Sequence, residues 1–188
     1  MKLKPSNQLD LYIHGNKLKY LISLYQEDKL PNKILLKGQR GIGKSTLAYH
    51  LINFVLSKDE DFPYDIDHFK INENNRSFKL VNNGSSPNFF LIDIQADKKN
   101  INIDQIRKII QDLNKSSLNN KPKFVLIDNS EYLNKNSINV LLKEIEEPND
   151  NIYFILIQNQ KTLLSTLTSR FIKFNINLSN KESIFVIN

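Results

Sequence analysis

Apolar positions along the chain alternate between short continuous runs and longer stretches with helical spacing. The runs predict buried strands at 34–36, 89–94, 124–127, 153–157 and 172–176. Asp93 interrupts the second run, and the last one alternates. Apolar residues three and four positions apart predict helices at 16–26, 45–57, 103–113 and 136–147, with a short helix at 163–168. Strands that alternate with helices are typical of a three-layer α/β fold, in which helices cover both faces of a mostly parallel central sheet.

Residues 58–87 do not follow this alternation. They are polar, charged and poorly periodic, and they end in the turn-forming run Asn82-Asn83-Gly84-Ser85-Ser86-Pro87. We predict a variable insertion or a long connection here, and no catalytic residue.

The composition is that of an ordinary globular chain, with 40% hydrophobic and 24% charged residues. A length of 188 residues suits one core, so we expect residues 1–188 to form a single domain. The chain has no cysteine, which excludes disulfides and thiolate metal sites and is compatible with a reducing cytoplasm. No apolar run approaches the roughly 20 residues of a membrane helix, and polar residues follow the opening Met1-Lys2-Leu3-Lys4-Pro5. We therefore expect a cytoplasmic protein with no membrane partner.

The formal charge of +6 and the pI near 9.3 leave two interpretations open. A basic surface would suit a nucleic acid or another polyanion. Only four of the 26 basic residues are arginine, however, and lysines are dispersed along the whole chain, which indicates compositional bias. Because of that bias the rarer residues are more informative, and three of the five glycines lie within six positions of one another.

These glycines belong to the run Gly38-Gln39-Arg40-Gly41-Ile42-Gly43-Lys44-Ser45, which matches the phosphate-binding pattern G-x-x-x-x-G-K-S/T in full. The run lies between a predicted strand and a predicted helix, as the pattern requires. Glycines let successive backbone N–H groups turn toward a phosphate, and the helix directs its positive dipole end at the same place. Lys44 would neutralise the terminal phosphates and Ser45 would ligate Mg²⁺.

Asp128 closes the apolar strand 124–127, where a carboxylate is expected as the second magnesium ligand, because ligands of an open α/β sheet bind outside the strand ends. The next residue is Asn129, whose amide cannot accept a proton at neutral pH, so hydrolysis is expected to be weak or absent. Glu131 could replace the missing acid only if the chain stays extended, so that Glu131 points to the same side as Asn129.

Three segments give a more specific resemblance. They are 125–134 (VLIDNSEYLN), 139–148 (NVLLKEIEEP) and 166–171 (TLTSRF). In this order they resemble the Walker B strand, the following "N-x-LLK-x-x-EEP" helix and the "T-x-x-S-R-C" segment of bacterial clamp-loader subunits of DNA polymerase III. Residues 41–48 (GIGKSTLA) and 103–107 (IDQIR) also look like family segments. The similarity runs from about residue 16 to residue 175, and Asn129 in place of an acid resembles the delta-prime type.

The resemblance implies an ATPase-fold domain of the AAA+ P-loop type that binds ATP or ADP with Mg²⁺. It implies nucleotide contacts from Gly38, Gln39, Arg40, Gly41, Ile42, Gly43, Lys44, Ser45, Thr46, Asp128, Gln158 and Asn159. Within this set Ser45 and Asp128 would hold the magnesium, while Gln158 and Asn159 would act as sensors. Arg170 would act in trans, on the nucleotide of a neighbouring subunit. The implied partners are the other clamp-loader subunits, the sliding clamp, and primed DNA through the assembled complex.

The chain also departs from the family pattern. Phe171 stands where a cysteine is usual, and the absence of all cysteines means that no structural zinc is expected. We expect neither the lid nor the collar domain of the family within 1–188. A delta-prime subunit of this kind would belong to a DNA polymerase complex without a polymerase active site of its own.

Three other functions compete with this interpretation. A motor-type clamp-loader subunit would hydrolyse ATP faster with DNA and clamp. A P-loop kinase would need an arginine-bearing lid, for which the chain has few arginines. A structural partner that binds no nucleotide would not need the complete phosphate-binding pattern.

Overall fold

The chain divides into two compact units. The computed structural model describes residues 4–115, 120–146, 151–159, 163–179 and 182. The first unit consists of Met1–Leu30, Gly38–Ser86 and Asn175–Asn188, and the second of Pro31–Lys37 and Pro87–Phe174. The predicted single domain over 1–188 stays a prediction.

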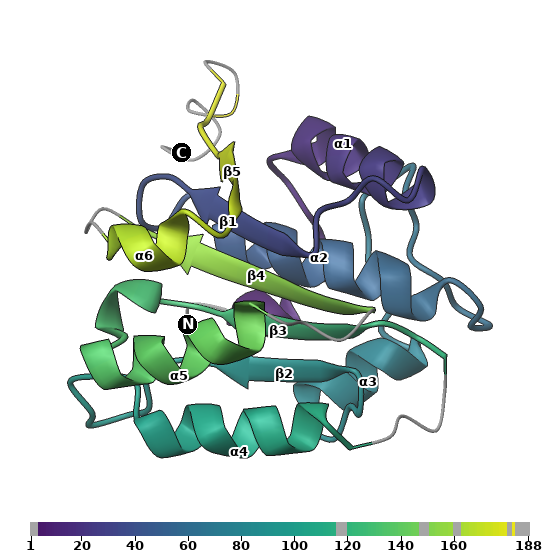
Figure 1. The fold of residues 1–188 in the computed structure, drawn as a ribbon. Coiled ribbons are helices and arrows are strands. Elements are labelled where there is room, and N and C mark those ends of the chain that lie inside the picture. The colour runs from purple at the N-terminus through teal and green to yellow at the C-terminus, as the bar shows by residue number, and fades with distance from the viewer. Residues whose placement is uncertain (1–3, 116–119, 147–150, 160–162, 180–181, 183–188) are drawn as a thin grey trace. The chain divides into compact units, whose positions relative to one another are not determined.

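The second unit is built on a sheet whose strands are ordered β2-β3-β4-β1-β5 (Figure 1). The strands are β1 (Lys33–Lys37), β2 (Phe89–Ile92), β3 (Lys123–Ile127), β4 (Ile152–Gln158) and β5 (Ile172–Asn175). The pairs β2·β3, β3·β4 and β1·β4 are all parallel. Parallel neighbours place their carboxyl ends at the same edge of the sheet, so the residues that follow β2, β3 and β4 meet there. The predicted α/β class and the parallel sheet are confirmed.

The central strands are apolar because both of their faces are buried. Every residue of β3 is buried, and so is every residue of β4 except Tyr153. Burial on both faces explains why these segments read as continuous apolar runs and not as an alternation.

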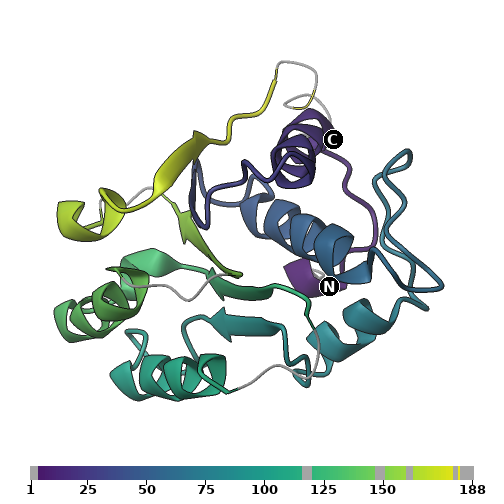
Figure 2. The same ribbon diagram turned by 45° about the vertical axis from the view of Figure 1, so that its right-hand side comes forward.

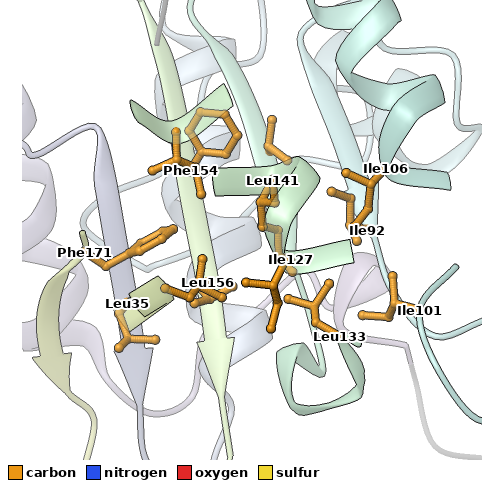
Figure 3. Close-up of a cluster of buried hydrophobic side chains, with 14 of the residues drawn as sticks. Leu35, Ile92, Ile101, Ile106, Ile127, Leu133, Leu141, Phe154, Leu156 and Phe171 are labelled. Carbon is orange, nitrogen blue, oxygen red and sulfur yellow. The ribbon is translucent and has the colours of Figure 1, made fainter. Parts of the chain in front are cut away.

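One face of this sheet packs against two helices that lie side by side in Figures 1 and 2. They are α4 (Ile103–Leu113) and α5 (Lys135–Glu146). Figure 3 shows the resulting core. Its buried members are Leu35, Ile92, Ile101, Ile106, Leu113, Val125, Ile127, Leu133, Ile138, Leu141, Ile145, Ile152, Phe154, Leu156, Leu163, Leu167 and Phe171. Phe171 is thus a core residue.

Asparagine side chains cap the first turns of the two helices. Asn102 Oδ1 accepts a hydrogen bond from the Asp104 N–H at 3.0 Å, and Asn134 Oδ1 accepts one from the Ser137 N–H at 2.8 Å. Such contacts satisfy backbone donors that the first turn of a helix leaves unpaired. The helix motif continues in the sequence to Glu147 and Pro148, which lie outside the described residues.

The first unit contains α1 (Gly15–Gln26), α2 (Lys44–Ser57), α3 (Arg76–Asn82) and the short 3₁₀ helix η1 (Pro5–Asn7). Helix α2 is buried on nearly all sides. All its residues except Ser45 and Phe54 are buried, polar ones included. A helix that is buried all round belongs to a core, and it must satisfy its polar side chains internally.

The structure corrects the prediction for residues 58–87. This segment is ordered: it contains α3 and an antiparallel bridge between Asp65 and Lys70. Asn75 is fully buried at the start of α3, where its Oδ1 accepts from the Phe78 N–H at 2.8 Å and its Nδ2 donates to the Phe62 carbonyl at 2.8 Å. Polar side chains replace a periodic apolar pattern here, which is why periodicity did not reveal the element.

The remaining elements are short. The segment after β3 forms the 3₁₀ helix η2 (Ser130–Tyr132), and the predicted short helix is confirmed as α6 (Ser165–Thr168). Within the described ranges, no helix has both the length and the apolar character needed to cross a bilayer.

Candidate nucleotide-binding residues

The glycine loop of the first unit has the backbone that the phosphate-binding pattern requires. Gly41 and Gly43 have φ values of 85° and 84°, in the left-handed region that other residues enter only with strain. Gly38 is needed for a different reason: a Cβ there would collide with the Ile176 carbonyl and lie 2.8 Å from Ile42 Cδ1. The space around a Cβ added to Gly41 is open to 4 Å, so the loop is not filled from this side.

Lys44 begins α2 and brings a positive charge into this loop. Its side chain is buried, with 3% of the residue exposed. The ammonium donates hydrogen bonds to the Gly38 carbonyl, at 3.0 Å, and to the Gln39 carbonyl. A buried ammonium needs hydrogen-bond acceptors, and charged phosphate oxygens are stronger acceptors than backbone carbonyls.

The other loop residues predicted as contacts divide by exposure. Gln39, Arg40 and Gly41 are exposed, and Ser45 is half-buried. Ile42 and Thr46 are buried, and Thr46 Oγ1 donates to Gln8 Oε1 at 3.0 Å. The structure therefore ties the threonine to the segment before α1, a contact that the sequence pattern does not contain.

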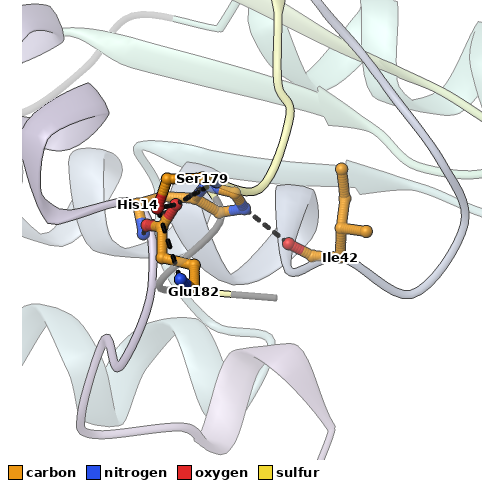
Figure 4. Close-up of polar contacts among 4 residues, drawn as sticks. All are labelled: His14, Ile42, Ser179 and Glu182. Atoms are coloured by element: carbon orange, nitrogen blue, oxygen red, sulfur yellow. Dashed lines mark hydrogen bonds and ion pairs between the residues drawn. The ribbon is translucent and has the colours of Figure 1, made fainter. Parts of the chain in front are cut away.

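His14 is a neighbour of the loop that sequence reasoning missed (Figure 4). Its Nε2 lies 2.6 Å from the Ile42 carbonyl, so this nitrogen is the donor. On its other side Nδ1 lies 4.0 Å from Glu182 Oε1 and, among the described residues, has no hydrogen-bond partner. His14 is 28 residues from Ile42 and 168 from Glu182, and no motif connects such distant positions.

Glu182 is held in place by two backbone donors and one hydroxyl. Oε1 accepts from the His14 N–H at 2.7 Å, while Oε2 accepts from the Ser179 N–H and hydroxyl, each at 2.8 Å. Burial would raise the pKa of the Glu182 carboxyl, but these hydrogen bonds outweigh it and lower the pKa. The carboxylate therefore stays charged beside His14.

Helix α2 is anchored by a second buried histidine. His50 Nε2 lies 3.1 Å from the Gln8 carbonyl and Nδ1 lies 2.8 Å from the Tyr64 hydroxyl. The carbonyl can only accept, so Nε2 carries the proton and Nδ1 accepts from Tyr64. Burial lowers the pKa of His50 from 6.5 to about 4, so the imidazole is neutral at pH 7.

In the second unit, polar residues follow three neighbouring strands at one sheet edge. Asp93 follows β2, Asp128 follows β3, and Asn159 follows β4. Asp128 is half-buried, and its Oδ1 accepts from the Asn129 N–H at 2.7 Å. Asn129 has φ 48° and ψ 42°, and its Nδ2 donates to Asp93 Oδ1 at 2.9 Å. Asp93 was not predicted as a site residue, because the apolar run placed it inside a strand over 89–94, whereas β2 ends at Ile92.

Glu131 does not meet the condition under which it could replace the missing acid. Asn129 is left-handed and η2 follows at once, so the chain is not extended. Glu131 Oε1 accepts from Asn159 Nδ2 at 2.8 Å, and Oε2 is buried without a hydrogen-bond partner among the described residues. Gln158 and Asn159, the predicted sensors, are both buried, and the second is bonded to Glu131.

Arg170 makes two contacts within its own unit. Nη1 donates to the Thr166 carbonyl of α6, and Nη2 pairs with Glu146 Oε1 at the end of α5. The side chains of the ion pair are 35% and 49% exposed, so the pair is accessible to water and contributes little to stability. The structure thus shows Arg170 as a partner of a helix end and a surface carboxylate.

The oxygen donors of this chain suit a magnesium ion that is also bound by phosphates and waters, and not one that is held by protein side chains alone. Within the described part of the chain, no group of three or more His, Asp or Glu side chains could hold a metal ion. Mg²⁺ is usually bound by one or two protein oxygens together with phosphates and waters, for which Ser45 and Asp128 have suitable chemistry. Positive φ at Gly41 and Gly43, with the buried Lys44 ammonium, likewise fits a nucleotide phosphate.

Comparison with solved structures supports the fold. A DNA polymerase III gamma subunit-related protein from Thermotoga maritima matches with a TM-score of 0.58 at 22% identity, over 86% of this chain and 47% of that one. The RuvB Holliday junction branch migration motor of the same organism matches with a TM-score of 0.54 at 20% identity, over 98% and 53%. The fold is that of an AAA+ P-loop protein.

Comparison with curated proteins identifies the family. DNA polymerase III subunit delta' of Pseudomonas aeruginosa is 30% identical over 140 residues, and that of Bacillus subtilis is 29% identical over 155. These alignments cover 74% and 81% of this chain but 41% and 44% of the relatives, so the chain spans less than half of their length. The family described as "DNA polymerase III, delta subunit" matches residues 13–180. With nearly the whole chain inside that match, the protein belongs to the DNA polymerase III delta-subunit family and is of the delta-prime type.

Proposed function

We propose that this chain binds Mg-ATP or Mg-ADP and serves as a delta-prime-like subunit of the DNA polymerase III clamp loader, helping to load the sliding clamp in replication. The observation that carries the nucleotide site is the glycine loop: two left-handed glycines precede a buried lysine whose ammonium donates hydrogen bonds to the Gly38 and Gln39 carbonyls of that loop. Such a loop is a preformed anion site at the start of a 14-residue helix.

Each residue has a distinct part in this proposal. The backbone N–H groups from Gly41 to Ser45 bind phosphate oxygens, and Lys44 exchanges the carbonyls of Gly38 and Gln39 for the terminal phosphates. Ser45 and Asp128 hold magnesium, which neutralises phosphate charge when bound. Gln39, Arg40 and Thr46 border the phosphates, and Gln158 and Asn159 sense the terminal one.

Hydrolysis by this chain is proposed to be very slow. Asn129 cannot take up a proton, and Glu131 accepts a hydrogen bond from Asn159. The nucleotide would then be retained and used for assembly with the other subunits, the clamp and primed DNA, in the cytoplasm.

A fluorescent-nucleotide titration tests the phosphate site. Lys44→Ala should weaken binding of Mg-ADP at least about tenfold, because it removes the cation that faces the terminal phosphates. Lys58→Ala is the matched control, since Lys58 is exposed at the opposite end of the same helix and should leave the affinity unchanged. Equal affinities of the wild type and the Lys44 variant would show that the loop is not a working phosphate site.

A motor-type clamp-loader subunit is the second candidate, because not all the relatives are named delta'. DNA polymerase III subunit gamma of Buchnera aphidicola subsp. Schizaphis graminum is 28% identical over 158 residues. Steady-state phosphate release that rises with DNA and clamp would favour this function. A rate that stays near background would favour the delta-prime function.

A further inference from the structure

Residues 8–14, here called the entry segment, contact the phosphate loop and the helix that follows it. At one end of the segment, Gln8 Oε1 accepts a hydrogen bond from Thr46 Oγ1 at 3.0 Å, in the first turn of α2. At the other end, His14 Nε2 donates to the Ile42 carbonyl at 2.6 Å (Figure 4). All these residues belong to the first unit. The entry segment is therefore placed to support the loop at two points.

A second set of contacts holds the entry segment from the connection between α2 and α3. The Leu11 N–H donates to the Phe69 carbonyl at 3.0 Å, and the Ile71 N–H donates to the Leu9 carbonyl at 2.8 Å. This connection is the part of the chain for which the sequence predicted no catalytic residue. The structure joins it by backbone hydrogen bonds to the segment that contacts the loop.

Phe69 has a backbone conformation that is costly for an aromatic residue. Its φ is 52°, in the left-handed region where bulky side chains are rarely found. Strained conformations of this kind persist only where the surrounding structure holds them, and they often mark functional positions. Here the turn is closed by two backbone hydrogen bonds between Asp65 and Lys70, each 2.9 Å long. The strain indicates that the placement of the Phe69 ring matters to this protein.

The ring of Phe69 covers the beginning of α1. A Cβ added to Gly15 would lie 2.8 Å from the Cε2 and Cζ atoms of this ring, so the two residues are in close contact. Lys19 Nζ, one turn further along α1, lies 5.2 Å from the ring centre. Gly15 directly follows His14, so the ring packs one residue away from the side chain that binds the Ile42 carbonyl.

We propose that Phe69 is a positioning residue of the phosphate loop. Its carbonyl and its ring hold the entry segment so that Gln8 and His14 keep their hydrogen bonds to α2 and to the loop. This inference rests on the proposed function, and it adds how the loop is kept ready for phosphate. A ligand binds only those molecules whose loop already has the competent conformation, so loss of this support weakens binding in proportion.

Hydrogen exchange of the nucleotide-free protein tests the positioning without reference to any ligand. The Leu47 N–H donates to the Gly43 carbonyl at 2.9 Å, so its exchange rate reports how firmly the loop is joined to α2. Phe69→Asn should raise this rate about three- to tenfold, because asparagine tolerates the left-handed backbone but has no ring. The Ile138 N–H, in the first turn of α5, should keep its rate. Phe62→Asn, which changes an exposed aromatic residue of the same connection, is the control and should leave both rates unchanged.

Two results of the exchange measurement would overturn the proposal. The first is an unchanged Leu47 rate in Phe69→Asn. The second is an equal rise at Leu47 and Ile138, since that would mean a general loss of stability and no specific effect on the loop.

Titration with fluorescent ADP in EDTA measures the effect on phosphate binding without any contribution from magnesium. Phe69→Asn should weaken binding about fivefold, as expected if the unsupported loop is competent in about one molecule in five. Phe62→Asn should bind as the wild type does. Gly15→Ala carries the same test should Phe69→Asn fail to fold, because its Cβ would displace the ring and leave Phe69 in the chain.

Wild-type affinity in Phe69→Asn would overturn the proposal, even if the melting temperature fell, because that combination describes a residue that serves only the fold. A wild type that binds no nucleotide would refute the proposed function. In that case the exchange measurement would still decide whether Phe69 positions the loop.

Discussion

His50 shows how a single buried base can make the stability of this protein depend on pH. Both ring nitrogens are used, one as donor to the Gln8 carbonyl and one as acceptor from Tyr64. Protonation would turn the acceptor into a second donor and would place a charge in a residue that is 0% exposed. The folded protein therefore binds this proton only near pH 4, whereas the unfolded chain binds it near pH 6.5.

We predict that stability falls as the pH is lowered from about 7 to 5. In this range the unfolded state binds more protons than the folded state, so the free energy of unfolding decreases by up to about 1.4 kcal/mol per pH unit. Urea unfolding at several pH values measures the slope. His50→Gln should be less stable at pH 7 but should flatten the slope. An unchanged slope in His50→Gln would contradict this assignment.

At the scale of elements, α3 and α4 begin with the same residue type in different environments. Asn75 is fully buried, and its side chain makes hydrogen bonds to three other residues, Phe78, Phe62 and Asn53. Asn102 is exposed and makes the one capping bond to Asp104. The first asparagine organises the segment before α3, whereas the second only completes the first turn of α4.

We predict that Asn75→Ala costs about 2–4 kcal/mol of unfolding free energy, because it leaves buried polar partners unsatisfied in addition to removing a cap. Asn102→Ala, the matched control, should cost about 0.5–1 kcal/mol. Chemical denaturation of both variants makes the comparison. Similar losses would mean that α3 contributes no more to the fold than a surface cap does.

At the scale of the whole molecule, Arg170 is the residue through which we expect this chain to act on another. It is held by Thr166 and Glu146, but the ion pair is accessible to water and so can be exchanged at little cost. A guanidinium is a planar, permanently charged fork that suits phosphate oxygens. The trans role therefore requires that Arg170 leave Glu146 when a neighbouring subunit is bound.

We predict that Arg170→Ala, assembled with the cognate subunits and clamp, lowers ATP turnover of the complex; in other P-loop enzymes such an arginine contributes roughly 10³–10⁵ in rate. The variant should keep its own nucleotide affinity and melting temperature. Glu146→Gln removes the ion pair but keeps the arginine, so its complex should be at least as active as the wild type. Unchanged turnover and clamp loading in Arg170→Ala would mean that the arginine has no trans role and serves only its contacts to Thr166 and Glu146.

The sequence by itself determined the order of the main elements and the position of the phosphate loop. Buried parallel strands must be apolar on both faces, and amphipathic helices must repeat every three to four residues, so local patterns located β1, β3, β4, α4 and α5 within one or two residues. The glycine loop could also be located from the sequence, because Gly41 and Gly43 occupy backbone conformations that few other residues adopt. These features depend on neighbours along the chain.

The tertiary structure alone decided which distant side chains satisfy one another. His14 with Ile42 and Glu182, Asn129 with Asp93, and Glu131 with Asn159 are hydrogen-bonded pairs between residues 28 or more positions apart. Each forms because a polar group removed from water needs a partner, and the nearest partner is set by strand order and helix packing. Strand order placed Asp93 beside Asn129. The left-handed backbone at Asn129 turns the chain into η2, so Glu131 bonds to Asn159 and does not take the position of the missing acid.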